Sequence, residues 1–551
     1  CFIHLTVQEF LAAKHIVETK KPKEIIEFIS SHVKHGKWHL VLQFLAGLLG
    51  KKMEMSEEYR SCALAFGEHL HPKVEVEGED IVYAALNDEL LMKCVRETEN
   101  DDIANKIAST CALKGVTKMH NRFGANWPSP SDWAAIVFVC KHLNFLKHLS
   151  LHLMIDFDSV LEITKLLRHR CIETLQFSSY VISPVQEALE HLLGAMTTSE
   201  CRINHEHCKL TLLNLYDNDI TDDDVPILTD FLEKTQGVFL KNLDLSLNEI
   251  TSDGISKFCD VLGHESCNKL EVLDLSHNRN IGDDGLRTLC NALEQKQHKL
   301  RELHLEQCSV TSAGASWLGQ VLGNKNCEIT HLNISYNSLH DEGVRMLCDG
   351  FRKGNGKLEV LDLSYCLLTS ACMPDLSELL KDEKCRLTDL SLSDHGIGYK
   401  GVRWLFNALR VKKCSLTKLD LSECSLTKKC MGSLGEVLSS EQCQLTNLNL
   451  AENNIADEGV EMLCCALEKQ QCKLTELNLS SCSLTKKCMG SLGEVLGSEE
   501  CQLTNLNLAE NNIVDEGVEM LCCALEKQQC KLTELNLSSC SLTGKCIVSL
   551  C

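Results

Sequence analysis

The 551-residue sequence has little proline, few aromatic residues and no long apolar run. Only 7 residues are proline and 5% are aromatic, so proline-rich disordered linkers are not expected. No run of about 18 apolar residues occurs, which leaves no candidate for a transmembrane helix. Basic residues are also scarce, since 55 Lys and Arg face 77 Asp and Glu and give a net charge of −22. This charge disfavours nucleic acids and anionic membranes as partners and favours basic proteins.

A Leu-x-x-Leu-x-Leu-x-x-(Asn/Cys)-x-(Ile/Leu) pattern recurs every 29 or 30 residues. Two weaker copies near residues 146 and 172 precede the regular ones, so about fourteen units are expected. Within each unit a period-two strand pattern is followed by a helical apolar stripe. One such unit cannot bury its own apolar face, so the units must stack. The regular copies begin at Leu210, Leu240, Leu270, Leu300, Ile329, Leu358, Leu387, Leu416, Leu445, Leu474, Leu503 and Leu532.

The residue that follows each strand alternates between two types. Asn337, Asn453 and Asn511 occupy one class of unit, cysteines such as Cys424 occupy the other, and His395 departs from both. We expect this side chain to turn inward and bond to unpaired backbone groups of the turn. Strand-plus-helix units with alternating Asn and Cys resemble leucine-rich repeats of the ribonuclease-inhibitor type. The predicted fold is an α/β leucine-rich-repeat horseshoe solenoid, with parallel strands inside and helices outside.

The 33 cysteines recur at a few fixed places in the repeat. Disulfide pairing among so many equivalent neighbours would be degenerate, so we expect free thiols that act as small core fillers. Free thiols indicate a reducing compartment and therefore the cytoplasm. Cys201, His205, His207 and Cys208 suggest a metal site, but their spacing matches no common zinc pattern, and Cys208 is explained by the repeat. No metal site is predicted.

Residues 416–473 and 474–531 are nearly identical 58-residue modules. They differ at six positions only, and a third copy begins at Leu532. We interpret them as a duplicated two-unit module. Because the third copy stops within its helix, the sequence predicts that a polar C-terminal cap is missing and that the chain is a fragment. The six differences are Lys418/Glu476, Asp420/Asn478, Glu423/Ser481, Ser439/Gly497, Gln442/Glu500 and Ala456/Val514.

Residues 1–130 lack the repeat and show helical stripes, so an all-α domain is expected before repeats at 131–551. The boundary follows from the turn sequence around Trp127 and Pro128. Residues 2–13 (FIHLTVQEFLAA) resemble the segment that closes the nucleotide-binding module of NACHT-containing NOD-like receptors. Residues 38–49 (WHLVLQFLAGLL) are similar to a later helix of the same receptors. The near-duplicate modules also resemble those of the expanded receptor sets of fish.

This resemblance implies a ligand-sensing and autoinhibitory region of a cytosolic receptor in innate immunity. It implies an upstream NACHT module that binds ATP or ADP, restraint of that module by the repeats, and oligomerisation on activation. No Gly-x-x-x-x-Gly-Lys-(Ser/Thr) sequence occurs in this chain, so no cofactor is assigned to it. His4 is a candidate nucleotide contact by the same resemblance, although a packing role is the simpler interpretation. No catalytic constellation is found, and no enzymatic activity is expected.

Residues beside the two strand leucines should point into the concave face. Tyr336 and Tyr365 lie one repeat apart, so their rings should lie about 5 Å apart, the spacing of strands. Together with nearby carboxylates they resemble a binding hot spot for a basic protein or another part of the same receptor; a solvated acidic surface is the alternative. A stand-alone inhibitor of a basic ribonuclease is the second functional hypothesis. The predicted site residues are Tyr336, Tyr365, Asp362, Asp394, Asp420, Glu423 and His304.

Overall fold

A computed structural model describes most of the chain and divides it into two compact units. The first unit contains Cys1–Asn248 and His264–Leu270, and the second contains Glu249–Gly263 and Glu271–Cys551. The described residues are 2–33, 35–53, 56–69, 76–77, 80–81, 89–110, 118–121, 130–142, 146–152, 157–169, 172–178, 185–197, 210–234, 240–262, 269–295, 298–354, 356–525 and 529–543.

The first unit begins with helices and continues into parallel strands. Its helices are α1 (Phe2–Thr19), α2 (Pro22–His32), α3 (His39–Met53), α4 (Arg60–His69), α5 (Glu89–Glu97), α6 (Asp101–Thr110), α7 (Pro130–Cys140), α8 (Phe157–His169), α9 (Val185–Thr197) and α10 (Val225–Lys234). Its strands are β1 (Val76–Glu77), β2 (Asp80–Ile81), β3 (Lys118–Asn121), β4 (His148–His152), β5 (Thr174–Ser178), β6 (Leu212–Asn214) and β7 (Asn242–Asp244).

The helical stripe predicted around residues 40–49 forms the core of α3. Leu42, Leu45 and Leu49 are fully buried on one face of this helix. The ring of Phe44 meets that of Phe10 of α1 edge to face, with centroids 5.6 Å apart, a favourable aromatic geometry. The helical character expected of this region is therefore present in α1 to α6.

Two strand features depart from the predicted all-α domain that ends at residue 130. β1 and β2 form a short antiparallel pair. β3 pairs in parallel with β4, from Lys118 opposite His148 to Asn121 opposite Leu151, so the parallel sheet begins before the predicted boundary. The sequence of β3 is Lys-Met-His-Asn and lacks the paired leucines of the repeat. The repeat pattern therefore could not reveal it.

The second unit is a regular array in which helices and strands alternate along the described residues. Its strands are β8 (Val272–Asp274), β9 (Glu302–His304), β10 (His331–Asn333), β11 (Val360–Asp362), β12 (Asp389–Ser391), β13 (Lys418–Asp420), β14 (Asn447–Asn449), β15 (Glu476–Asn478), β16 (Asn505–Asn507) and β17 (Glu534–Asn536). Its helices are α11 (Ser252–Val261), α12 (Gly282–Gln295), α13 (Ser312–Gly323), α14 (His340–Lys353), α15 (Met373–Lys381), α16 (Gly398–Leu409), α17 (Lys428–Leu438), α18 (Ala456–Leu467), α19 (Met489–Leu496) and α20 (Val514–Leu525).

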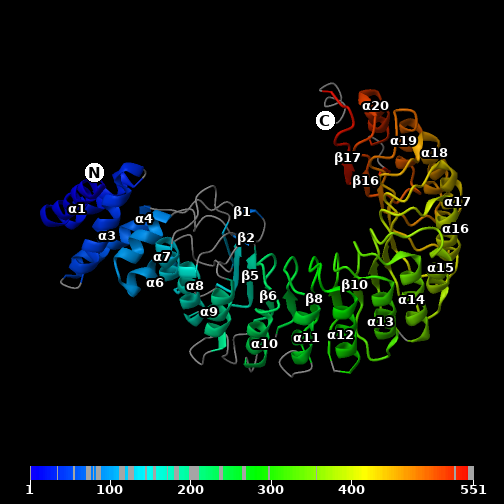
Figure 1. The fold of residues 1–551 in the computed structure, drawn as a ribbon. Helices are drawn as coiled ribbons and strands as arrows, with labels where there is room; N and C mark the ends of the chain where they lie inside the picture. Colours follow the sequence, from blue (N-terminus) through cyan, green and yellow to red (C-terminus); the bar gives the residue numbers. More distant parts are fainter. Residues whose placement is uncertain are drawn as a thin grey trace. The chain divides into compact units, whose positions relative to one another are not determined.

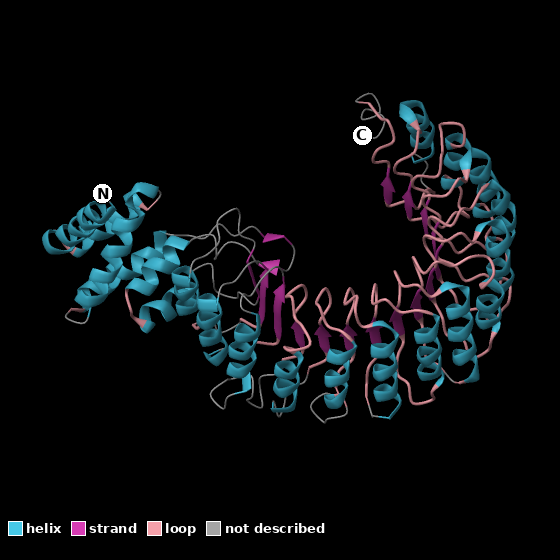
Figure 2. Cartoon of the chain, in the orientation of Figure 1, coloured by secondary structure: helices cyan, strands magenta, loops and turns pink. Residues whose placement is uncertain are grey.

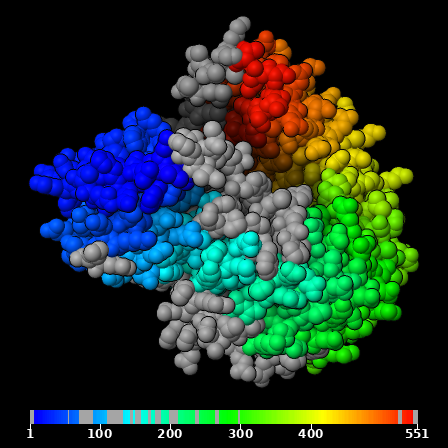
Figure 3. Space-filling model, turned by 60° about the vertical axis from the view of Figure 1, so that its left-hand side comes forward, coloured from blue at the N-terminus to red at the C-terminus, as the bar shows by residue number. Residues whose placement is uncertain are grey.

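Within the second unit, the strands form a parallel sheet in sequence order. The register places equivalent residues opposite each other, so Leu419 of β13 faces Leu448 of β14 and Leu448 faces Leu477 of β15. The strands line the inner side of this curved array and the helices its outer side (Figures 1 and 2). The repeats follow one another, from green to red, as a continuous surface (Figure 3). The predicted leucine-rich-repeat solenoid is confirmed.

Each repeat buries one strand leucine pair and one helical stripe. In the unit that contains β14 and α18, Leu448, Leu450, Val460, Leu463 and Leu467 are all buried. The strand residues on either side of Leu448 are half-exposed, because successive side chains in a strand point to opposite faces. Apolar burial thus continues from repeat to repeat and forms one core.

The alternating Asn residues connect each repeat to the one before it. The Asn453 Nδ2 donates to the carbonyl oxygens of Leu421, Leu450 and Ala451 at 2.8, 3.0 and 3.0 Å. Its Oδ1 accepts from the backbone N–H groups of Cys424 and Leu426. The Ala451 carbonyl also accepts from the Glu423 N–H. For the other groups this one amide supplies a partner, and such buried backbone groups would be costly to leave unpaired.

The cysteines of the alternate units also connect neighbouring repeats, but with fewer side-chain hydrogen bonds than the asparagines. The Cys482 thiol donates to the Leu450 carbonyl of the preceding unit at 3.1 Å, and the Cys482 N–H donates to Asn511 of the next unit. Burial raises the pKa of the Cys482 thiol to about 11, so it stays protonated and can donate. Almost all of the cysteines that the structure describes are buried, so the predicted packing of cysteines in the core is confirmed there.

His395 replaces the asparagine in one repeat and reproduces two of its bonds. Its Nε2 lies 2.8 Å from the Leu363 carbonyl, and its Nδ1 accepts from the Leu368 N–H at 3.3 Å. This pattern requires a neutral ring with the proton on Nε2. Burial lowers the pKa of His395, although the Leu363 carbonyl and the carboxylates of Asp394, Asp341 and Asp362 oppose that shift.

Acidic residues at the helix starts also connect neighbouring repeats. Asp457 lies in the first turn of α18, and its two carboxylate oxygens accept from the N–H and the hydroxyl of Thr485 in the next unit, at 2.8 and 2.7 Å. Burial alone would raise the pKa of Asp457, but these bonds lower it. Asp283–Thr311 and Asp341–Thr369 repeat the arrangement. Tyr399 occupies the equivalent place before Thr427, which makes no side-chain cap bond.

We expect Asn453→Ala to lower the free energy of unfolding by about 3 kcal/mol, because several buried backbone groups lose their partner. Urea titration followed by circular dichroism measures this. The matched control is Asn454→Ala, whose side chain is exposed and whose loss should cost about 0.5 kcal/mol or less. Equal losses in the two variants would contradict the role assigned to the Asn453 amide.

His395 should make stability depend on pH. Its pKa is lower in the folded chain than the unfolded value of about 6.5, so the unfolded state takes up the proton first. Stability from this group is therefore complete above pH of about 6.5 and falls as the pH drops toward the folded pKa. His395→Asn should keep the hydrogen bonds to the preceding repeat and remove the dependence of stability on pH in that range. Urea midpoints measured across this range for both proteins would contradict the assignment if the two profiles ran parallel.

Candidate functional site

The residue three positions after the end of each strand has an unusual backbone conformation. In the second unit these rim residues have φ between 51° and 63°, the left-handed region that bulky residues seldom adopt. The conformation lets each N–H donate to the next repeat, as Tyr336 does to the Ser364 carbonyl at 2.9 Å and Tyr365 to Ser393 at 3.0 Å. The rim residues are His277, Gln307, Tyr336, Tyr365, Asp394, Glu423, Glu452, Ser481, Glu510 and Ser539.

The two rim tyrosines stack on each other. The ring centroids of Tyr336 and Tyr365 lie 4.0 Å apart and the ring planes differ by 9°, closer than the expected strand spacing. Tyr336 is 45% exposed, so the stack presents an aromatic surface to solvent. Such an exposed, rigid aromatic pair is typical of the anchors in protein interfaces.

The rim carboxylates lie beside this tyrosine pair. The pKa of Tyr365 is raised, first by a hydrogen bond with Tyr336, then by burial and by the negative charges of Tyr336, Glu423 and Asp394. The predicted residues Tyr336, Tyr365, Asp394 and Glu423 are thus brought together on consecutive repeats, and we call them the tyrosine patch. The combination of aromatic faces and carboxylates suits a cationic side chain of a partner.

Asp362 and Asp420 are the last residues of β11 and β13 and lie three positions before the rim residues of those repeats. One oxygen of Asp362 accepts from the N–H and the hydroxyl of Ser364, and Asp420 binds Ser422 in the same way, with N···O distances of 2.9 and 2.8 Å. The second oxygen of Asp420 accepts from Asn449 Nδ2 at 2.9 Å. These hydrogen bonds hold the two carboxylates in place and use some of their acceptor positions within the chain.

His304 lies on the other side of the tyrosine pair from Asp394 and Glu423. It lies on β9 opposite Asn333 of β10, two strands away from Asp362. Its Nε2 lies 3.9 Å from a carboxylate oxygen of Glu302. The structure therefore places it at the edge of the tyrosine patch rather than within it. That a partner binds any of these residues stays a prediction.

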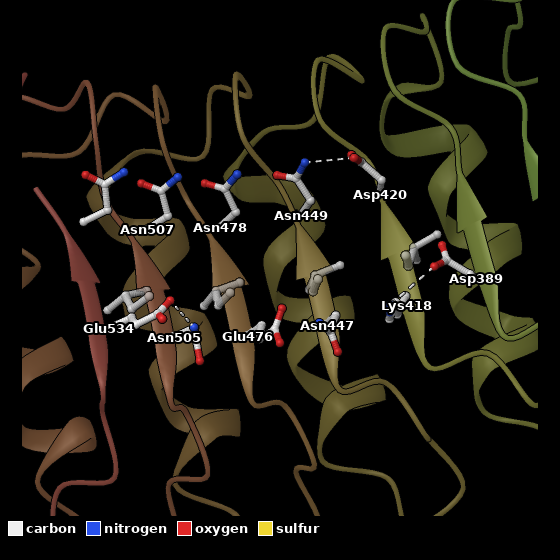
Figure 4. A pocket seen from close by; sticks show the side chains of 15 residues that line it. Asp389, Lys418, Asp420, Asn447, Asn449, Glu476, Asn478, Asn505, Asn507 and Glu534 are labelled. Carbon is white, nitrogen blue, oxygen red and sulfur yellow. Dashed lines mark hydrogen bonds and ion pairs between the residues drawn. The ribbon is translucent and has the colours of Figure 1, made fainter. Parts of the chain in front are cut away.

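A groove crosses the concave face of β12 to β17, next to the tyrosine patch (Figure 4). It encloses about 500 Å³. Among the residues of its lining, the predicted site residues include only Asp420, although the period of two places the residues on both sides of the first strand leucine on this face. We call it the amide groove, and its polar lining is Asp389, Lys418, Asp420, Asn447, Asn449, Glu476, Asn478, Asn505, Asn507, Glu534 and Asn536.

Several weaker candidates from the sequence lie outside the described residues. Cys201, His205, His207 and Cys208 fall in such a segment, and His4 lies in α1 but its side chain is not described. Among the residues that the structure describes, no group of three or more His, Cys, Asp and Glu could hold a metal ion. In the same part of the chain, no helix has the length and apolar character needed to cross a membrane.

Two family models, described as Leucine Rich repeat and Leucine Rich Repeat, match parts of the chain. The first matches residues 238–259, 266–290, 325–348, 442–464 and 501–522, and the second matches 473–495 and 531–551. These matches fall on the repeats whose strands and helices are described above. The fold and the repeat define the chain as a leucine-rich-repeat protein.

The chain is similar in sequence to particular leucine-rich-repeat proteins. NACHT, LRR and PYD domains-containing protein 3 is 34% identical in Bos taurus and 36% identical in Homo sapiens, over 74% and 73% of this chain. This chain spans 40% and 45% of those relatives. The mouse ribonuclease inhibitor is 33% identical over 44% of this chain and 56% of its own length. The predicted resemblance to NOD-like receptors with NACHT modules and leucine-rich repeats is confirmed.

We expect Tyr336→Phe to lower the pKa of Tyr365 toward the ordinary tyrosine value of about 10, because the substitution removes the hydrogen bond that contributes most to the shift. Ultraviolet absorbance of tyrosinate during alkaline titration measures this. The control Tyr399→Phe removes a tyrosine of α16 and should leave the step at highest pH in place. An unchanged titration of Tyr365 in the first variant would contradict the coupling.

Proposed function

We propose that this chain is the ligand-sensing and autoinhibitory region of a cytosolic NOD-like receptor of innate immunity, and that it acts by binding proteins. The observation that carries the proposal is the stacked pair Tyr336 and Tyr365 beside Asp394 and Glu423 on the concave face. An exposed aromatic pair with neighbouring carboxylates binds a protein surface that presents Lys or Arg. The similarity to receptor relatives supports this reading.

In this proposal the repeats restrain an upstream nucleotide-binding module until a ligand engages them. The partner of the tyrosine patch is a basic surface of that module or of the ligand. Restraint requires that the patch bind the closed state more tightly than the open one, since a contact equal in both states shifts no equilibrium. ATP or ADP binds to the upstream module, to which this chain contributes no phosphate-binding loop, and release leads to oligomerisation.

The double variant Tyr336→Ala/Tyr365→Ala tests the proposal. In the full-length receptor we expect it to weaken association with the ligand or with the nucleotide-binding module tenfold or more. That change corresponds to about 1.4 kcal/mol, and loss of an aromatic anchor commonly exceeds it. Affinity is measured by calorimetry, with oligomer size followed by light scattering.

Leu367→Ala is the matched control, because Leu367 follows Tyr365 closely in the sequence, is 57% exposed and also has positive φ. It should leave association unchanged. A double variant that folds, as judged by its urea midpoint, and still associates and oligomerises like the unaltered receptor would refute the proposed role of the patch.

A stand-alone inhibitor of a basic ribonuclease is the second candidate. The similarity to mouse ribonuclease inhibitor and the acidic concave face favour it. The helices α1 to α6 argue against it, because a stoichiometric inhibitor needs only the repeats. Titration of a basic ribonuclease with this chain discriminates the two, since stoichiometric loss of ribonuclease activity is expected from the inhibitor alone.

A further inference from the structure

The amide groove runs across the strands between two rows of side chains (Figure 4). One row contains Asn449, Asn478 and Asn507, which lie between the two buried leucines of their strands. The other row comes from the position two residues earlier and includes Glu476 and Glu534. Leucine residues that separate the rows along each strand form the floor of the groove. The groove is therefore a track perpendicular to the strands with different chemistry on its two sides.

The asparagine row offers oriented hydrogen-bond donors. The Oδ1 of Asn478 accepts from the Ser480 N–H and that of Asn507 from the Ala509 N–H, both at 3.0 Å. Each bond fixes the plane of its amide and leaves the Nδ2 group to donate into the groove. Asn449 differs, because its Nδ2 already donates to Asp420.

The opposite row and the groove ends carry an excess of negative charge. Four carboxylates line the groove, and its single ammonium group, Lys418, lies 3.8 Å from Asp389. Glu534 accepts from Asn505 Nδ2 at 2.5 Å. Glu476 makes no ion pair with any of the residues that the structure describes. Bulk charge here matches a cationic polypeptide and disfavours phosphate or anionic lipid.

The duplicated modules differ where they face this groove. Of the six differences between residues 416–473 and 474–531, three fall on the concave side of one strand and its rim. Lys418 is replaced by Glu476, Asp420 by Asn478 and Glu423 by Ser481, while the buried leucines between them are unchanged. The changes alter the surface and leave the core intact, and they convert the second copy into the pattern that continues to β17.

We propose that the amide groove binds an extended basic segment of a protein partner, and that Glu476 and Asn478 determine its specificity. This inference rests on the proposed protein-binding function and names a second, separate contact on the same face. Asn478 and Asn507 donate to backbone carbonyl groups of the segment. Glu476 and Glu534 pair with two of its cationic side chains.

The spacing of the carboxylates sets the spacing of the cations. Glu476 and Glu534 lie on β15 and β17, which are separated by β16, so they lie about 10 Å apart at a strand spacing of about 4.8 Å. An extended chain in the polyproline II conformation has three residues per turn and rises about 3.1 Å per residue, so residues i and i+3 lie on the same side of the segment, about 9 Å apart. Basic residues at positions i and i+3 therefore match the groove, and those at i and i+2 do not.

Two acetylated twelve-residue peptides of Lys and Ala test this. Both contain four Lys residues, placed at every third position in one peptide and at every second position in the other. We expect the intact chain to bind the first peptide at least tenfold more tightly, as measured by fluorescence anisotropy. Equal affinity for the two peptides would overturn the proposal.

The variant Glu476→Lys/Asn478→Asp/Ser481→Glu gives β15 the groove residues of β13, which the same fold already accommodates. We expect this variant to fold normally and to bind the peptide with Lys at every third position at least tenfold more weakly. The control Glu452→Gln removes a rim carboxylate that does not line the groove and should change affinity less than threefold. An unaffected triple variant, or self-association of the chain that the same variant abolishes, would show that the groove has another role.

The peptide experiments test the groove separately from the proposed function. Tyr336→Ala/Tyr365→Ala leaves the groove intact, so it should retain the peptide even though it weakens receptor association. If the tyrosine variant has no effect on association, the proposed function fails while the peptide preference still stands. If the peptides bind equally, the groove proposal fails and the tyrosine result is untouched.

Discussion

The hydrogen bonds of the buried asparagines hold one repeat to the next. Each strand of the second unit is only three residues long and leaves turn groups unpaired on both sides. Asn337, Asn453 and Asn511 each take up such groups from two units at once. A buried unpaired backbone group is costly, so these contacts fix how closely and at what register the repeats stack. Apolar burial alone would leave that register less well defined.

The same geometry produces the surfaces that we assign to binding. Because the register is constant, equivalent side chains of successive strands line up across the concave face, and a short sequence change is displayed at a defined place. The left-handed rim conformation directs Tyr336 and Tyr365 to the edge, where they stack. The position inside the strand directs Asn478 and Asn507 into the amide groove. Two different chemistries thus lie next to each other on one sheet.

Much of the fold could be predicted from the sequence, because it depends on local periodicity. The leucine spacing gave the strands, the helices and their order, and the alternation of Asn with Cys gave the inward turn. The strand β3 could not be predicted, since Lys118 to Asn121 carry no repeat pattern and the strand is recognised only by its pairing with β4. The bonds from Thr485 to Asp457 could not be predicted either, because Thr485 belongs to the next unit.

The sequence by itself determined which residues face the concavity, since side-chain alternation is a property of each strand. It also indicated the tyrosine pair, because their separation by one repeat is enough to make them neighbours. Only the tertiary structure decided that the Nδ2 group of Asn449 donates to Asp420, whereas those of Asn478 and Asn507 point into the groove. It also decided that the row of Glu476 and Glu534 completes the groove. The physical reason is that the direction of a hydrogen bond and the volume of a groove depend on several strands together, whereas the alternation of buried and exposed side chains is a property of a single strand.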